Sequence, residues 1–540
     1  MKLQHGKAWW FFLAIICICN ISLSVAHGAD LKDDVAERKF SQGYAKMLGK
    51  AREKGGIRVI VKVDLDYFKD GEFSEDQLEE YRAHIAYKQR QLLNEHSLVN
   101  VRNVRLMSIS PYIIMTVTAS ELEALKSVPG AISVEEDTVT TPMLLESLPG
   151  IGGSISGDFI YQNNSYTGNG QTVVVLDTPI QSYHEFLRGK LSSEACFSSN
   201  DGSRESLCPG GALSALGPGA ASEIVRCESF ALETYACGHG SLVSGIAAGK
   251  SDDIDVGEPR TGVAANAALV HINVSHVQTD HVACGIVNPV YGAPHDCLQS
   301  FVGDQLDALN YILGKISSSA GNGIWGHVAA INMSLGSDEL YTGNCDSGYT
   351  AIYDLIASLR KKGVATIAST GNEGSSNSMS YPACLSNVIS VAAADSYAGI
   401  YSELASLSNL NGGTDLVAPG VLIRSSMDWW FDPDSAWFGQ GYAEASGTSF
   451  AAPHVAGAWA VLRSAKPSAT VSEVLSVLKS TGVLLGRDGT SITKPMIKID
   501  KAIQALMTAG SGGGSGGSGG STAAQVTASV VIPATYLLLN

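Results

Sequence analysis

The chain has 540 residues, of which 52 are acidic and 36 are basic, so its net charge at pH 7 is −16. Charged residues make up 16% of the chain and apolar residues 45%, whereas about 25% of an average domain is charged. This composition excludes disorder driven by charge, and the acidic balance argues against a nucleic acid partner. Beyond the first segment there is no apolar run of about 20 residues, which excludes a polytopic membrane protein.

The N-terminal segment has the pattern of a secretory signal. Lys2 and Lys7 precede an apolar stretch over residues 8–21, and small residues follow at 24–26. This order predicts a signal peptide over residues 1–26, with cleavage after Ala26. The alternative is a retained membrane anchor. We expect an exported protein, secreted or periplasmic, without a stable membrane span in the mature chain.

Eight of the ten cysteines lie outside the signal segment, and an even number in an exported chain predicts disulfides. Eight cysteines allow 105 pairings, so the sequence does not fix the connectivity. A bond between Cys284 and Cys297 would close one short surface loop. A zinc site is the alternative, but it needs closely spaced Cys or His ligands that this sequence lacks.

A small module precedes the main one. Residues 57–63 mostly alternate between apolar and polar, which predicts a strand, and helical spacing follows near residues 78–92. Two strand-like runs, a short helix and a last strand over residues 131–136 complete the order β-α-β-β-α-β. This is the order of a ferredoxin-like unit over residues 57–136.

The main module spans residues 145–508. Apolar strand-like runs alternate there with helical patterns, which predicts an α/β fold with a mostly parallel sheet and helices on both faces. The runs cover residues 171–176, 267–274, 328–334, 364–369 and 388–394. In such sheets, sites lie at the carboxyl ends of the strands.

Four polar residues stand at expected strand or helix ends. Asp177 ends a buried strand, His239 lies between glycines at a helix start, Asn372 follows a strand, and Ser449 opens an apolar helix. Taken singly, each is more often a turn former, a packed residue or a cap. Together they supply an acid, a base, an amide donor and a hydroxyl nucleophile, the groups that acyl transfer needs.

The motifs around these residues resemble the subtilisin-like serine proteases, the subtilase or peptidase S8 family. The order acid, base, serine is that of subtilisin, and the match covers residues 170–508. The most specific motif is residues 447–457, and residues 370–372 match the oxyanion-hole loop. The resemblance implies that Ser449 attacks the peptide carbonyl, that His239 transfers the proton, that Asp177 orients His239, and that Asn372 stabilises the oxyanion. It also implies that Ser334, Leu335 and Gly336 bind the substrate as an added β-strand.

The module at 57–136 is similar to the inhibitor-I9-like propeptides of this family. The resemblance implies a self-processed zymogen whose propeptide, residues 27–144, acts as an intramolecular inhibitor and folding assistant. The catalytic domain would span residues 145–508, followed by a Gly/Ser linker at 509–521 and an apolar tail at 522–540. The expected partners are protein or peptide substrates and the chain's own propeptide. No cofactor is expected to be required, and no acidic loop in the sequence supports the structural calcium found in some family members.

Two residues depart from the family pattern. Pro179 stands where the family has Gly, and Leu242 replaces a second histidine. These departures motivate one alternative, a catalytically inactive binding protein on the same scaffold. A second alternative keeps the chemistry but passes the acyl group to an amine, as in a ligase or cyclase. An α/β-hydrolase is set aside because Ala451 replaces a required Gly and the acid and base precede the serine.

The segment between Asp177 and His239 is longer than the family's usual spacing and carries four cysteines. We interpret it as a cross-linked surface insertion near the substrate cleft.

Overall fold

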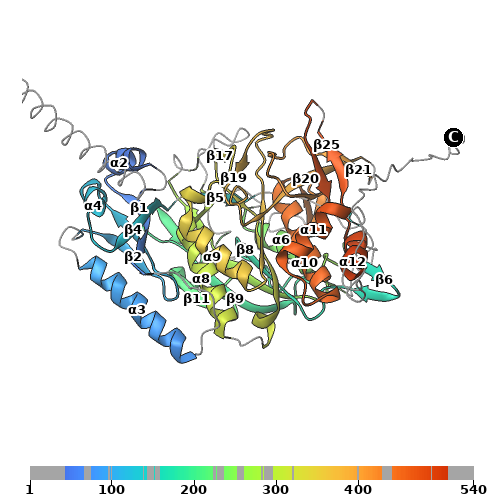
Figure 1. Cartoon of the computed structure of the whole chain (residues 1–540), viewed down its shortest axis with the longest axis horizontal. Helices are drawn as coiled ribbons and strands as arrows, with labels where there is room; N and C mark the ends of the chain where they lie inside the picture. Colours follow the sequence, from blue (N-terminus) through green and yellow to red (C-terminus); the bar gives the residue numbers. More distant parts are fainter. Residues whose placement is uncertain are drawn as a thin grey trace, which may run out of the picture.

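The computed structural model describes most of the small and main modules (Figure 1). It covers residue 40 and residues 43–508, except 66–74, 95–97, 99, 138, 143–150, 152–158, 223–226, 228–235, 252–258, 260, 281–283, 285–295, 319–321, 398–399, 428–440 and 488. The predicted signal peptide, linker and apolar tail lie outside the described residues.

The small module follows helix α2 (Tyr44–Glu53) and has the order β-α-β-β-α-β. Its sheet has the strand order β2-β3-β1-β4 and is antiparallel at its β1 pairings. The alternating residues Val59, Val61 and Val63 of β1 turn one face of this sheet into an apolar core. The elements are β1 (Ile57–Val63), α3 (Glu75–Leu93), β2 (Arg102–Leu106), β3 (Tyr112–Val117), α4 (Ala119–Leu125) and β4 (Ala131–Glu136).

The main module is built on a large sheet with the order β11-β9-β12-β8-β15-β18-β20-β22-β26-β25, to which β21 adds at β20. Its central neighbours, from β9 to β26, pair in parallel. The strands are β8 (Thr172–Asp177), β9 (Leu191–Phe197), β11 (Ser214–Leu216), β12 (Ala268–Asn273), β15 (Val328–Met333), β18 (Ala365–Ser369), β20 (Ile389–Tyr397), β21 (Ile400–Leu404), β22 (Leu416–Pro419), β25 (Val483–Gly486) and β26 (Thr493–Met496).

Helices cover both faces of this sheet, as the alternation of apolar side chains on β8 requires. Val173 and Val175 pack in the core cluster that contains residues of α6 and α10. Val174 and Leu176 point to the opposite face and pack in the cluster that contains residues of α8 and α9. The helices are α6 (His239–Ala248), α8 (Val302–Ser318), α9 (Thr350–Lys361), α10 (Thr448–Ala465), α11 (Val471–Thr481) and α12 (Ile499–Thr508). The predicted α/β architecture is confirmed.

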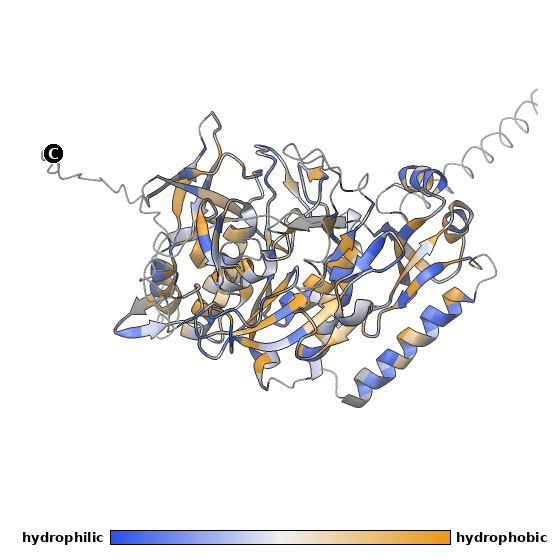
Figure 2. Cartoon of the chain, turned by 180° about the vertical axis from the view of Figure 1, so that it is seen from behind, coloured by the Kyte–Doolittle hydropathy of each residue, from blue (hydrophilic) through white to orange (hydrophobic). Residues whose placement is uncertain are grey.

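Hydrophobic residues are concentrated in the interior strands, whereas hydrophilic and hydrophobic residues alternate along α3 (Figure 2). Among the described residues, no helix combines the length and the apolar character needed to cross a bilayer.

A second sheet joins the two modules. Its order is β10 (Arg204–Ser206), β13 (His276–Gln278), β14 (Cys297–Phe301), β5 (Val139–Pro142) and β16 (Leu335–Gly336). Strand β5 directly follows the small module, and it lies between two strands of the main module, antiparallel to both. This strand is not among the elements predicted from the sequence.

The smaller elements are two-stranded. They are β6 (Phe159–Tyr161) with β7 (Asn164–Tyr166), β17 (Leu340–Tyr341) with β19 (Met379–Ser380), and β23 (Ile423–Ser426) with β24 (Tyr442–Ala445).

All eight cysteines outside the signal segment form disulfides. The predicted bond between Cys284 and Cys297 is present. Two further bonds cross-link the segment between Asp177 and His239, and the fourth ties the region before α9 to the turn after β19. These pairs are Cys196–Cys208, Cys227–Cys237 and Cys345–Cys384.

Candidate active site

Asp177 and His239 form a buried hydrogen-bonded pair at the carboxyl edge of the sheet. Asp177 is the last residue of β8, and His239 is the first residue of α6. The imidazole Nδ1 lies 2.5 Å from Asp177 Oδ1, which also accepts a hydrogen bond of 2.8 Å from the Thr178 backbone N–H. A carboxylate that accepts from Nδ1–H selects the tautomer in which Nε2 carries the lone pair that a general base needs.

Ser449 is the second residue of α10, and its side chain is buried. The ring centroid of the next residue, Phe450, is 5.5 Å from that of His239, which places the first turn of α10 against α6. The Ser449 hydroxyl donates to the Ser334 carbonyl at 3.3 Å, and the Ser334 hydroxyl donates to the Ser449 carbonyl at 2.6 Å. In the described part of the chain, the Ser449 hydroxyl therefore donates its hydrogen bond to the carbonyl oxygen of Ser334. A rotation about χ1 is the motion that would redirect it to the imidazole.

Asn372 lies at the N-terminus of the same helix. Its Oδ1 accepts hydrogen bonds from the backbone N–H and the hydroxyl of Thr448, at 2.8 and 2.9 Å. The amide oxygen is thereby assigned to the helix end, and the NH₂ group occupies the other side of the amide. Gly371 has a φ of +99°, and a Cβ at that position would lie 2.4 Å from Asn409 Nδ2, so only glycine fits this turn.

A second buried histidine, His271, forms hydrogen bonds to the turn after Asp177. It was not predicted as a site residue from the sequence. His271 lies on β12, and its Nε2 is 2.7 Å from the Thr178 carbonyl oxygen, while its Nδ1 is 2.9 Å from the Ser244 hydroxyl on α6. Burial lowers the pKa of His271, which keeps the ring neutral. A neutral ring satisfies both contacts when Nε2–H donates to Thr178 and Nδ1 accepts from Ser244.

The turn after Asp177 and the start of α6 are in close contact. The Gly240 N–H donates to the Thr178 hydroxyl at 2.9 Å. A Cβ on Gly240 would lie 2.3 Å from the Thr178 carbonyl oxygen and 2.8 Å from that of Pro179. Leu242, one of the two departures from the family pattern, is buried in the same core cluster as Val173.

The predicted substrate-binding strand lies beside the serine. Leu335 and Gly336 form β16, and they pair with Pro142 and Thr141 of β5. On its other side, β5 pairs with Ser300 and Phe301 of β14. Ser334 contacts Ser449 instead of joining this ladder. An extended segment therefore occupies the space between β14 and β16, next to the predicted nucleophile.

A parallel sheet that carries an aspartate, a histidine and a serine at its strand and helix ends is the framework of a serine peptidase. The model of the subtilase family, Peptidase S8, matches residues 168–495, and the chain belongs to this family. The prediction of a subtilisin-like serine endopeptidase is confirmed.

Several curated proteases are similar to this chain. An alkaline protease of Alkalihalobacillus alcalophilus is 27% identical over 396 residues, which cover 73% of this chain and 80% of that protein. Subtilisin BL of Lederbergia lenta is 32% identical over 249 residues, which cover 46% of this chain and 71% of that protein. A solved structure of proteases from Pseudoalteromonas arctica PAMC 21717 is similar, with a TM-score of 0.45 and 25% identity, and the match covers 63% of this chain and 91% of that chain.

Proposed function

We propose that the protein is an exported endopeptidase, made as a zymogen, that hydrolyses peptide bonds of proteins through an acyl-enzyme. The observation that carries the zymogen proposal is the position of β5. This strand belongs to the segment that links the small module to the main one, and it lies along β16 beside Ser449. The four disulfides support export, because such bonds persist in oxidising compartments.

The proposed reaction begins at Ser449. Its hydroxyl is a weak nucleophile until the imidazole of His239 accepts the proton. The Ser449 oxygen attacks the substrate carbonyl, and His239 then donates the proton to the leaving amine. In the second half-reaction, water gives a proton to His239 and attacks the acyl-enzyme. The carboxylic acid product then leaves, and the Ser449 hydroxyl is restored. Asp177, hydrogen-bonded to Nδ1, stabilises the imidazolium that forms in each half-reaction.

The oxyanion of the tetrahedral intermediate needs donors that are already in place. We assign this role to the Asn372 side-chain NH₂ and to the Ser449 backbone N–H. Asn372 is anchored through Oδ1 to Thr448, and Ser449 lies in the first turn of α10, where the helix dipole favours negative charge.

We assign β5 to the C-terminal part of an inhibitory propeptide. A peptide substrate would add to β14 and β16 as an antiparallel strand, and β5 makes those same backbone pairings. While β5 stays in place, a substrate cannot form them. This supports residues 27–144 as a propeptide that blocks its own enzyme.

Two carboxylates of the small module support the proposed folding role. Glu135 accepts hydrogen bonds from the Thr350 hydroxyl and the Ala351 N–H at the start of α9, at 2.8 and 3.2 Å. Asp137 accepts from the Gly303 N–H at the start of α8, at 2.5 Å. Both satisfy N–H groups that a helix start leaves unpaired.

The proposal is tested by purifying the secreted wild-type chain and the Ser449→Ala variant in parallel. N-terminal sequencing and intact mass should show a wild type that begins near residue 145 and a variant that keeps the small module. Removing the serine should lower turnover by about 10⁶-fold, the magnitude known for subtilisin itself. A variant that still processes itself would overturn the assignment of Ser449. A product mass with an amine joined to the acyl group would instead identify a ligase.

A further inference from the structure

A buried ion-pair cluster lies where the small module meets α8. The guanidinium of Arg105, on β2, places Nη1 2.9 Å from Asp304 Oδ1 and 2.7 Å from Asp307 Oδ2. Both aspartates lie in the first two turns of α8. The side chain of Asp304 has no exposed surface, and that of Asp307 is 17% exposed. One arginine thus bridges two carboxylates of the main module.

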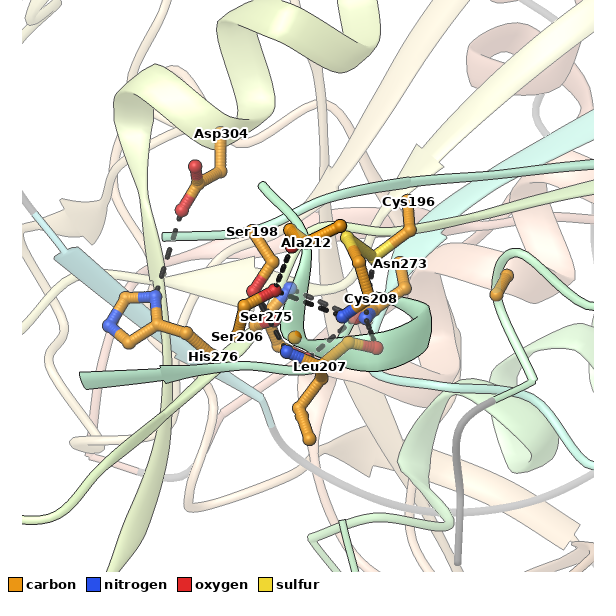
Figure 3. The surroundings of a disulfide bond; sticks show 12 residues. Cys196, Ser198, Ser206, Leu207, Cys208, Ala212, Asn273, Ser275, His276 and Asp304 are labelled. Atoms are coloured by element: carbon orange, nitrogen blue, oxygen red, sulfur yellow. Dashed lines mark hydrogen bonds and ion pairs between the residues drawn. A yellow bond between two sulfur atoms is a disulfide. The ribbon is translucent and has the colours of Figure 1, made fainter. Parts of the chain in front are cut away.

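A fully buried histidine faces the same carboxylate. His276, on β13, stacks on Phe301 with ring centroids 5.0 Å apart, and its Nδ1 is 3.6 Å from Asp304 Oδ2 (Figure 3). Within the described residues, neither ring nitrogen has a hydrogen-bond partner. Burial lowers the pKa of His276, so the ring is neutral and does not balance the charge of Asp304. The Ser199 hydroxyl, 3.0 Å from each Asp304 oxygen, adds a neutral donor.

The remaining charges of the cluster already have partners. The Arg58 Nε is 2.5 Å from Asp137 Oδ2, and its guanidinium lies 4.4 Å from the centroid of the Phe301 ring. Arg204 is paired with Asp201 at 2.9 Å. Burial on its own raises the pKa of Asp304, but Arg105, His276 and Arg58 together outweigh burial, and the pKa lies below its ordinary value. Arg105 is therefore the cation that the two α8 carboxylates hold.

Maturation would remove this cation. Arg105, Arg58 and Asp137 all belong to the proposed propeptide, whereas Asp304, Asp307, His276, Ser199 and Phe301 belong to the main module. Once the propeptide leaves, the two aspartates lose the guanidinium between them. Two neighbouring carboxylates without a cation between them repel each other, so an incoming positive charge is favoured there.

The emptied position lies on the path of an extended substrate. Phe301, the last residue of β14, pairs with Val139 of β5, and α8 starts at the next residue. Asp137 therefore stands two residues before the strand position opposite Phe301. A Cβ on Gly303 would lie 2.5 Å from Asp137 Oδ2 and 3.1 Å from Arg105 Nη2. A substrate side chain in the place of Asp137 thus ends next to the position of the guanidinium.

We infer that the mature enzyme has a subsite for a basic residue, in which Asp304 and Asp307 bind the arginine or lysine of a peptide substrate. The inference rests on the proposed function, because it requires a released propeptide and a substrate that replaces β5. The basic residue stands at the fifth position before the one that pairs with Leu335, since Asp137 stands there relative to Pro142. Arginine and lysine both meet this requirement, because a single nitrogen, Arg105 Nη1, contacts both carboxylates.

The test uses the matured full-length product and three peptides that are identical except at this position, with arginine, citrulline or alanine. Citrulline keeps the shape of arginine without its charge. Arginine should raise kcat/KM about tenfold over citrulline at low ionic strength, and the ratio should shrink with added salt. Asp307→Asn should reduce the ratio severalfold. Asp354→Asn should leave it unchanged, although Asp354 also contacts the small module, through Lys62 at 2.7 Å.

The outcomes distinguish a failure of the basic subsite from a failure of the proposed endopeptidase activity. If the wild type cleaves all three peptides at equal rates, the basic subsite is refuted and the endopeptidase stands. If the wild type cleaves none of them, the proposed function falls and the subsite falls with it. Should Asp307→Asn fail to mature, the arginine-to-citrulline ratio of the wild type and its salt dependence decide the question without any variant.

Discussion

The Nε2 of His271 lies 2.7 Å from the carbonyl oxygen of Thr178. Through this contact, a ring on β12 holds the residue that follows Asp177, and through its Nδ1 the same ring holds Ser244 on α6, the helix that begins with His239. One neutral imidazole thus links the turn after Asp177 to the helix that carries His239.

Two substitutions at His271 should separate its two contacts. Glutamine can place its NH₂ near the position of Nε2 and keep the bond to Thr178, whereas asparagine reaches only the Nδ1 side. His271→Asn should lower kcat about 10- to 100-fold with little change in KM, because small misplacements of catalytic groups carry such costs. His271→Gln should retain most of the activity. Steady-state kinetics on one peptide measure both values. An equal loss in both variants would mean that His271 only fills space.

The amide of Asn372 should matter for kcat far more than for KM. Asn372→Ala should lower kcat about 10²- to 10³-fold, the usual cost of losing one oxyanion donor. Asn372→Asp keeps the oxygen that accepts from Thr448 but replaces the NH₂ with a negative charge, so its loss should be at least as large. Activity retained in the aspartate variant would show that the amide only caps α10.

The affinity of the propeptide should fall as the pH rises. Burial raises the pKa of Glu135 to about 7, despite the hydrogen bonds from Thr350 and Ala351 that oppose the shift. A raised pKa in the complex means that binding takes up a proton. The stabilisation is therefore complete below about pH 4.5, the ordinary value for Glu, and is lost as the pH approaches 7.

Glu135→Gln provides the matched control for this pH dependence. Glutamine keeps the oxygen that accepts from the start of α9 but does not titrate. Inhibition of the matured enzyme by added propeptide should weaken at least about tenfold between pH 4.5 and 7 for the wild type. The slope should be shallower for the variant. Identical slopes would contradict the role given to Glu135.

Local patterns in the sequence predict the main sheet and the residues at its carboxyl edge. The apolar runs that end at Asp177 and Ser369 are strands because their side chains fill a core on both faces. Asp177 and His239 are brought into contact as predicted, while the hydroxyl of Ser449 has Ser334 as its recorded partner. A hydroxyl rotamer depends on what lies in the cleft, and a sequence motif does not contain that information.

Contacts between distant elements escape the sequence analysis. Strand β5 lacks a clear alternation of its own, and it exists because β14 and β16 supply its partners. In the sequence, His271 is a single polar residue within an apolar strand. Its two hydrogen bonds, to Thr178 and Ser244, depend on contacts that only the folded structure shows. Asp304 and Arg105 are 199 positions apart in the sequence, and no local pattern links them.

The central claim is that His239 activates Ser449, and covalent labelling with a fluorophosphonate probe tests it most directly. Matured wild-type protein should take up one probe per chain, on the peptide that contains Ser449, and His239→Ala should react far more slowly. An unlabelled Ser449 in correctly matured protein, or a label on another serine, would contradict the claim.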